Sequence, residues 1–243
     1  MSTTPLGSAV DALYVAFESY ARPETFLACG CGECFEGWPV VPGAHWNDTQ
    51  RPLVIVDGPG EGQDLHQLDA HALAGIVWNV PLTGGSADVL KHYLPRIFEI
   101  VSAEDYDAFT VHWPDIEIVV SRIAYAGAPN ASPWWTWPED EQTAIREFFD
   151  ALWLRDRAET HDADDTLCAL GRAVPDIEPY LQHWSSDDRP SARTSLRDFR
   201  ESNAAVLEGG TLWNAYWDDK QEPTNSNRSR VTRWVREAQP QGR

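Results

Sequence analysis

The sequence predicts an all-α protein of seven to nine packed helices, interrupted by one irregular insertion rich in Cys, Gly and Pro near residues 24–64. Apolar residues recur three and four positions apart over most of the chain, which is the helical period, whereas the alternating pattern of strands is almost absent. The expected organisation is a single helical domain over residues 1–243, because this length lies near the upper end of what one hydrophobic core organises.

The first helix is predicted by its boundary signals. Thr4 is a suitable N-cap and Pro5 suits the first turn, and the helix is expected to end near Arg22. The insertion follows, and within it only the run Leu53-Val-Ile-Val56 has the character of a short strand. The glycines and proline of residues 57–62 indicate a turn rather than a phosphate-binding loop, because the proline lacks an amide donor and two carboxylates would repel a phosphate.

The middle of the chain returns to the helical pattern. One helix is expected over residues 65–78, and a second is capped by Ser86. Pro95 lies inside the apolar stripe of this second helix and is expected to kink the helix or to divide it into two segments. Residues 116–123 favour another helix, with a strand as the alternative.

The longest predicted helix covers residues 138–157. Acidic residues in its first turn and arginines in its last turn complement the helix dipole at both ends. Its apolar side chains are predicted to be buried: Ile145, Phe148, Phe149, Leu152 and Trp153. Shorter helices are expected over residues 164–173, 176–184, 191–207 and 228–237.

The charge is unevenly distributed along the sequence. Residues 1–188 contain 31 acidic and 9 basic side chains, a net charge of −22, whereas residues 189–243 contain 7 and 10, a net charge of +3. Such a field repels nucleic acid and anionic lipid, so neither is an expected partner. No apolar run approaches the roughly 20 residues needed to cross a bilayer, and the start of the chain lacks a signal sequence, so a cytoplasmic location is expected.

Three cysteines lie close together in the insertion. Thiolates at this spacing on a Gly-rich loop are able to bind a soft cation, so Cys29, Cys31 and Cys34 are candidate ligands of a structural zinc ion, with His45 as the nearest fourth ligand. Cys168 and more distant histidines are alternative fourth ligands. The competing interpretation is a loop of reduced cysteines without metal.

Tryptophans crowd just before the longest helix. Trp134, Trp135 and Trp137 either fill junctions between helices or, if exposed, form an anchor for a partner, since Trp is enriched at interface hot spots. The sequence contains no nucleophile elbow, no metalloprotease motif and no phosphate-binding motif, and therefore favours a protein that is not an enzyme.

Three landmarks together resemble a group of uncharacterised bacterial helical proteins. They are the cysteine cluster after the first helix, the phrase His92-Tyr-Leu-Pro-Arg-Ile-Phe-Glu99, and the helix that begins at Trp137-Pro-Glu and ends in Leu152-Trp153. The similarity covers roughly residues 10–155. It implies a helical cytosolic protein and supplies no catalytic residue, because no activity is known for the group.

Composition and motifs together lead to three functional hypotheses. The first is a non-enzymatic interaction factor, of the inhibitor or immunity type, whose acidic face covers a basic site on another protein. The alternatives are a zinc-stabilised housekeeping module and an enzyme whose catalytic groups converge from distant parts of the chain. A homo-oligomer, in which the basic carboxy-terminal helices neutralise acidic surface of another copy, also remains open.

Overall fold

The computed structural model describes residues 4–29, 40–48, 51–80, 85–103, 115–124, 132–158, 162–207 and 209–237. Nine α-helices lie in these ranges, and the described chain is mostly helical, which confirms the predicted fold class. The chain divides into two compact units, residues 1–145 and residues 146–243, and the boundary falls inside helix α5. The single domain expected from the sequence stays a prediction, since two compact units are able to belong to one domain.

The first unit is built on four complete helices and the beginning of a fifth. The α-helices are α1 (Pro5–Ala16), α2 (Ala70–Asn79), α3 (Ala87–Val101), α4 (Ile116–Ser121) and α5 (Glu139–Asp156). Short 3-10 helices lie between them: η1 (Leu65–Gln67), η2 (Arg122–Ala124) and η3 (Trp134–Thr136). The helix expected over residues 65–78 is therefore divided into η1 and α2.

Side-chain caps fix the starts of three of these helices. Thr4 accepts a hydrogen bond from the backbone N–H of Gly7 at 3.1 Å, and Ser86 accepts one from Val89 at 3.4 Å, as the sequence predicts. Asp69 caps α2 in the same way, accepting from Ala72 at 2.8 Å. The first helix ends at Ala16, earlier than expected, because the chain turns at residues 17–19.

Helix α3 runs through Pro95 as one continuous helix, so the expectation that the proline divides it is wrong. A proline inside a helix removes one backbone hydrogen bond, here the one to the carbonyl of Lys91. The apolar stripe of α3 is buried almost along its whole length, with Leu90, Tyr93, Leu94, Ile97 and Phe98 each at most 2% exposed. This packing outweighs the loss of the one bond.

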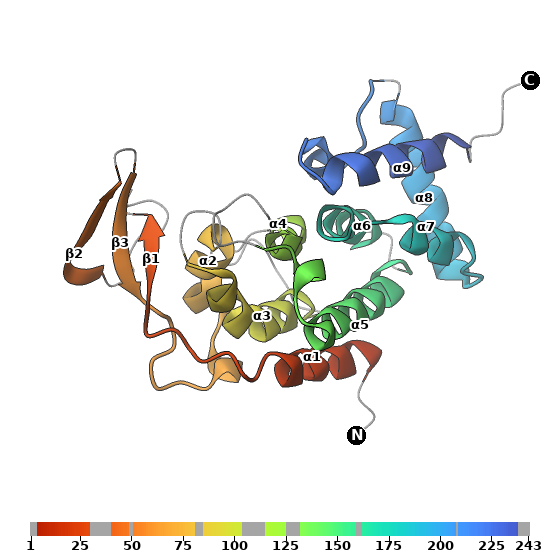
Figure 1. Ribbon diagram of the computed structural model, residues 1–243. Coiled ribbons are helices and arrows are strands. Elements are labelled where there is room, and N and C mark those ends of the chain that lie inside the picture. The colour runs from red at the N-terminus through yellow and green to blue at the C-terminus, as the bar shows by residue number, and fades with distance from the viewer. Residues whose placement is uncertain are drawn as a thin grey trace, which may run out of the picture. The chain divides into compact units, whose positions relative to one another are not determined.

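The insertion contains a three-stranded antiparallel sheet, where the sequence indicates only one short strand. Its order is β1 (Thr25–Cys29), β3 (Arg51–Asp57), β2 (Val40–Asp48), so the predicted strand Leu53–Val56 forms its centre (Figure 1). Strand β2 includes Pro42, which argues against a strand in a sequence but is tolerated at the edge of a sheet. The register shifts between Val40 and His45, around this proline.

The second unit contains the end of α5 and four further helices: α6 (Asp162–Ala173), α7 (Glu178–Ser185), α8 (Pro190–Leu207) and α9 (Thr224–Glu237), with the short helix η4 (Ala215–Asp218) before the last. Its core is aromatic: the rings of Trp153 and Trp184 meet edge to face with centroids 5.0 Å apart, and Phe199 lies 5.1 Å from Trp184. Helix α6 comes so close to Trp217 that a Cβ atom on Gly171 would lie 2.1 Å from the indole ring.

Helix α9 begins at Thr224, four residues before the predicted start at residue 228. Asn227 explains the difference, because it is fully buried and fastens the helix. Its side-chain amide donates to the carbonyls of Gly171 and Val174 at 2.9 and 2.8 Å, and its oxygen accepts from the backbone of Ile177 at 3.2 Å.

None of the helices in the described ranges is long and apolar enough to cross a membrane.

Candidate functional site

The two units differ strongly in charge. Residues 1–145 contain 20 acidic and 5 basic side chains, a net charge of −15, and residues 146–243 contain 18 and 14, a net charge of −4. The acidity predicted for the first 188 residues is therefore concentrated in the first unit. The candidate site is the surface of that unit.

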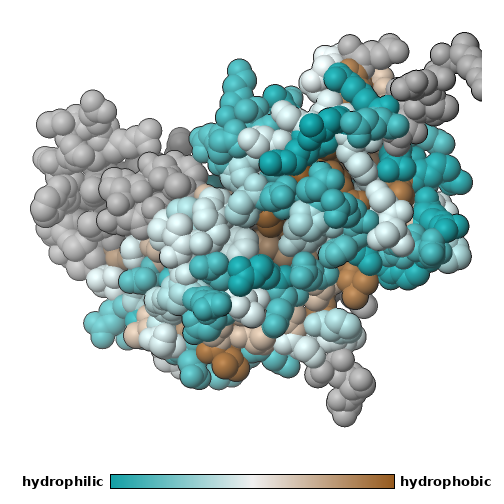
Figure 2. All heavy atoms as spheres, turned by 45° about the vertical axis from the view of Figure 1, so that its right-hand side comes forward, coloured by the Kyte–Doolittle hydropathy of each residue, from teal (hydrophilic) through white to brown (hydrophobic). Residues whose placement is uncertain are grey.

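Carboxylates dominate the described surface of the first unit. Exposed acidic side chains occur along the described parts of this unit: Asp11, Glu18, Glu24, Asp57, Glu61, Asp64, Asp69, Asp88, Asp115, Glu139 and Asp140. Among the side chains described in this unit, no Lys or Arg is exposed to the same degree. Figure 2 shows hydrophilic residues over much of the described surface on one face of the molecule. On the described surface of the first unit, the exposed carboxylates therefore have no exposed Lys or Arg between them.

The four cationic side chains described in the first unit all contact backbone carbonyls or carboxylates of the same unit. Arg22 donates to the carbonyls of Gly58 and Pro59, and Tyr93 donates to the same Pro59 carbonyl at 3.1 Å. The turn at residues 57–62 therefore presents carbonyl oxygens to an arginine. A phosphate-binding loop would instead present backbone N–H groups, so the predicted structural turn is the better interpretation. Nε of Arg122 donates to the carbonyl of Val77 at 2.7 Å. This carbonyl lies at the carboxy-terminal end of α2, where the helix dipole stabilises a cation.

The third inward cation, Lys91, forms a buried ion pair. Its Nζ atom lies 2.7 Å from Oε2 of Glu141, and the side chains are only 7% and 4% exposed. Tyr20 joins them, since its hydroxyl donates to the other oxygen of Glu141 at 2.6 Å and accepts from Lys91 at 2.8 Å. Burial, and then the hydrogen bond to the Glu141 carboxylate, raise the pKa of Tyr20 well above its ordinary value. The cluster connects α3 to α5 and neutralises Lys91 inside the unit.

The fourth cation, Arg96, belongs to a cluster at the surface. Oε2 of Glu99 accepts from the Tyr14 hydroxyl at 2.6 Å and from Nη1 of Arg96 at 2.8 Å, while Nε of Arg96 donates to the carbonyl of Leu68 at 2.6 Å. His66 stacks on Tyr14 with ring centroids 3.9 Å apart and an interplanar angle of 24°. Burial acts to raise the pKa of Glu99, but the hydrogen bonds from Tyr14 and Arg96 outweigh it and keep this pKa below its ordinary value.

Sequence reasoning did not identify this surface cluster. The spacing of Arg96 and Glu99, three residues apart on one helix, is the one signal in the sequence that indicates a contact. The contact between Tyr14 and Glu99 joins residues 85 positions apart and has no local signature.

The predicted zinc ligands lie mostly outside the described residues. Cys31 and Cys34 are not described, and for Cys29 and His45 the structure gives only the backbone. Cys29 pairs with Leu53 on one side of the central strand and His45 with Val54 on the other, so the central strand separates the two backbone positions. Within the described side chains, no group of three or more His, Cys, Asp or Glu residues is arranged to hold a metal ion. Zinc binding therefore stays a prediction.

The predicted tryptophan anchor is largely internal. Trp134 and Trp137 are 3% and 5% exposed, and Trp135 is half-buried. The indole N–H of Trp137 donates to the carbonyl of Ser132 at 2.8 Å, and its ring lies 4.4 Å from Nζ of Lys91. This tryptophan therefore contributes a cation–π contact to the buried ion pair. A role of the three tryptophans in binding a partner stays a prediction.

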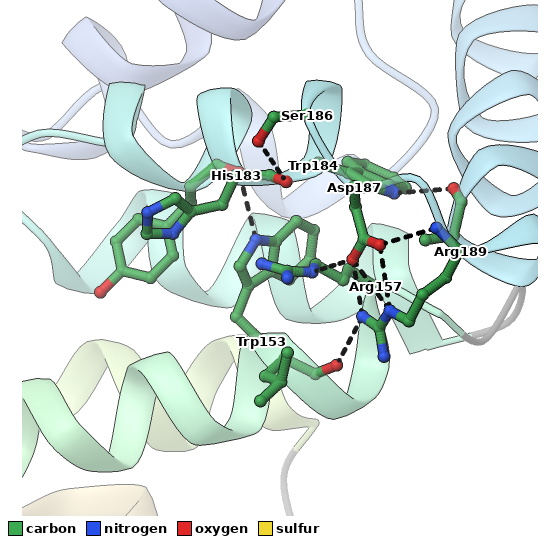
Figure 3. A network of polar contacts seen from close by, with 10 residues as sticks. Trp153, Arg157, His183, Trp184, Ser186, Asp187 and Arg189 are labelled. Carbon is green, nitrogen blue, oxygen red and sulfur yellow. Dashed lines mark hydrogen bonds and ion pairs between the residues drawn. The ribbon is translucent and has the colours of Figure 1, made fainter.

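Figure 3 shows a polar network of the second unit that connects helices to a loop. Asp187 accepts hydrogen bonds from Nε of Arg157 at 2.8 Å and from Nη2 of Arg189 at 2.7 Å (Figure 3). The hydrogen bonds from Arg189 are the main reason that the pKa of Asp187 lies well below its ordinary value. Nη2 of Arg189 also donates to the carbonyl of Leu154 at 3.1 Å, so the network connects the end of α5 to the segment between α7 and α8.

A hollow of about 350 Å³ lies along α9, and its described lining consists of Asn225, Ser226, Ser229, Arg230 and Arg233. It brings together no histidine and carboxylate, so this lining offers no acid–base pair. Comparisons of the chain with models of protein families, with curated proteins and with solved structures found no match. Function is therefore argued from the chain's own residues.

Proposed function

We propose that the protein is a non-enzymatic interaction factor, of the inhibitor or immunity type, whose acidic first unit covers a basic site on a protein partner. The observation that supports this proposal most is the segregation of charge in the first unit. Eleven carboxylates are exposed there, while the four described Lys and Arg side chains are buried or half-buried and contact carbonyls or carboxylates of the same unit. A cytoplasmic location is part of the same proposal.

Segregation matters because an exposed cation beside a carboxylate cancels its field within a few ångströms. With the cations turned inward, the potentials of the exposed carboxylates add over the surface, and they attract a basic partner from a distance comparable to the Debye length. Complementary fields of this kind raise association rates and reject partners of the wrong charge. The same field rejects nucleic acids and anionic membranes.

The proposal is tested by titrating the purified chain with two peptides of equal length, one rich in Lys and Arg and one rich in Asp and Glu. We expect the basic peptide to bind at about 0.01 M salt, where the Debye length is about 30 Å, and to dissociate at about 1 M salt, where it is about 3 Å. Binding of the acidic peptide, or affinity for the basic peptide that does not change with salt, contradicts electrostatic docking.

A zinc-stabilised module is the second candidate, supported by the close spacing of Cys29, Cys31 and Cys34 in the sequence. Metal analysis of the purified protein distinguishes it. We expect about one equivalent of zinc and a lower melting temperature after chelation, because ligand binding stabilises only the folded state. Less than about half an equivalent, or melting that chelation leaves unchanged, contradicts this candidate.

A further inference from the structure

We propose that an arginine side chain of the basic partner stacks on His66 and pairs with the carboxylate of Glu99, an inference that rests on the proposed function and names its main contact. We call Tyr14, His66 and Glu99 the α1 platform. The platform combines an exposed ring with a carboxylate held at its edge, and these are the two features by which proteins recognise a guanidinium group.

The stacked rings leave one ring face available. Tyr14 covers one side of the His66 imidazole at a centroid distance of 3.9 Å, yet the His66 side chain remains 58% exposed. The exposed surface therefore includes the side of the imidazole that faces away from Tyr14. A planar guanidinium is able to lie on this face as the next layer of the stack.

The Glu99 carboxylate is oriented before any partner arrives. Two hydrogen bonds, from Tyr14 and from Arg96, hold the same oxygen, Oε2, while the side chain remains 35% exposed. Nδ1 of His66 lies 3.8 Å from this oxygen, so the ring and the carboxylate are adjacent. An interaction that is already ordered costs less conformational entropy on binding.

Further carboxylates surround the platform. Asp11 lies one turn before Tyr14 on α1, Glu18 lies in the turn that follows the helix, and both are exposed. Asp64 accepts a hydrogen bond from the backbone N–H of His66 at 3.0 Å and is exposed as well. The nearest described cation, Arg96, is 20% exposed and is bound to Glu99 and to the carbonyl of Leu68.

Arginine fits this arrangement better than lysine does. The guanidinium is flat, so it is able to stack on the ring while an N–H group at its edge donates to Oε1 of Glu99, the oxygen that Tyr14 and Arg96 do not hold, whereas an ammonium group is a compact and strongly hydrated point charge. The surrounding carboxylates attract both cations equally. The platform therefore adds a preference for arginine to a field that does not distinguish the two.

The test compares an Arg-rich and a Lys-rich peptide of equal length and charge, binding to the full chain and to three variants. We expect His66→Ala to weaken the Arg-rich peptide about two- to fivefold and to leave the Lys-rich peptide unchanged, because only the stacking contact is lost. His66→Phe keeps a ring and should retain most of the preference for arginine. His71→Ala is the matched control, because it removes an exposed histidine of α2 outside the platform.

The outcomes separate this inference from the proposed function. Binding of both peptides with no effect of His66→Ala, or with an equal loss for both, overturns the platform and leaves docking to the acidic unit standing. A wild-type chain that binds neither peptide at low salt overturns the proposed function itself. Melting temperatures of the variants identify any that fail to fold, in which case His66→Phe supplies the comparison.

Discussion

The two units differ in the exposure of their described arginine and lysine side chains. In the first unit, the described cationic side chains are buried or half-buried and contact internal groups. In the second unit, cations stand exposed at the surface, several of them beside a carboxylate, as with Arg193 and Asp188 or Arg197 and Asp198. The described surface of the first unit therefore exposes charges of one sign, whereas that of the second unit exposes both signs. Net charge along a sequence does not reveal this difference, which depends on where each side chain points.

The same comparison separates two kinds of ion pair. Lys91 and Glu141 in the first unit are removed from water, so each depends on the other for compensation of its charge. The side chains of Arg193 and Asp188 are 65% and 86% exposed, so both remain hydrated. Water easily replaces the contact between them. Substitutions in the buried pair should therefore lower the free energy of unfolding much more than substitutions in the exposed pairs.

The largest effect is expected from breaking the buried pair. Lys91→Met leaves the Glu141 carboxylate buried without its cation and should lower the free energy of unfolding by about 3 to 5 kcal/mol. Urea denaturation followed by circular dichroism measures the change. The double variant Lys91→Met with Glu141→Leu should recover much of the loss, because it removes the isolated charge. A single variant that costs less than about 1 kcal/mol argues against the buried pair.

The next largest effect concerns the second unit, where Asn227 fastens α9. Asn227→Ala leaves the buried backbone groups of Gly171, Val174 and Ile177 without this partner, and we expect a loss of about 2 to 3 kcal/mol in the same assay. Asn225→Ala, on the same helix but half-exposed, is the control and should change stability by less than about 0.5 kcal/mol. Equal effects of the two substitutions would show that Asn227 is not the anchor.

A smaller effect, dependent on pH, is expected at Asp164 in the second unit. Burial, with a contribution from the neighbouring charge of Asp165, raises the pKa of Asp164 from 3.8 to about 7. Between these values the folded state holds a proton that the unfolded state has released, so this group makes the protein less stable as pH rises through that window. Asp164→Asn should therefore leave stability unchanged below the window and raise it by about 1 to 3 kcal/mol above it.

Thermal melting of wild type and variant across this pH range checks the prediction. A difference between the two proteins that is the same at every pH contradicts it. Asp165→Asn provides a second comparison, since removal of the neighbouring charge should lower the pKa of Asp164 and shift the window toward lower pH.

The smallest effect is expected at the exposed pair of Arg193 and Asp188. Arg193→Ala should change the free energy of unfolding by less than about 0.5 kcal/mol, because both partners remain solvated when the contact is lost. A loss similar to that of Lys91→Met would remove the distinction between the buried pair of the first unit and the exposed pairs of the second.

Local physics explains what the sequence predicts well. Thr4, Ser86 and the apolar stripes of α1, α3 and α5 are signals that lie within one helix, and the structure confirms them. The edge strands were missed because β1 is only five residues long and β2 includes a proline. The sequence predicts that Pro95 kinks or divides α3, and the helix is undivided because the surrounding stripe packs against its neighbours, which is a tertiary effect that periodicity does not report.

The polar clusters depend on contacts between distant residues, and the sequence does not reveal them. Tyr20 and Glu141 are 121 positions apart, and the burial of Lys91 follows only when α3 and α5 pack together. Acidity was predicted from composition, but the inward orientation of Arg22, Lys91 and Arg122 required the fold. The acidity of the candidate site is therefore predictable from composition, whereas the absence of exposed cations among its described side chains follows only from the fold.

The most direct test of the account asks where a basic partner binds. One variant neutralises Glu18, Glu24 and Glu61 of the first unit as glutamines, and a matched variant neutralises Glu147, Glu201 and Glu237 of the second; all six are exposed, and the two variants have equal net charge. Affinity for a Lys- and Arg-rich peptide at low salt should fall about fivefold or more in the first variant and less than about twofold in the second. Equal losses would show that affinity follows net charge alone and would contradict the assignment of docking to the first unit.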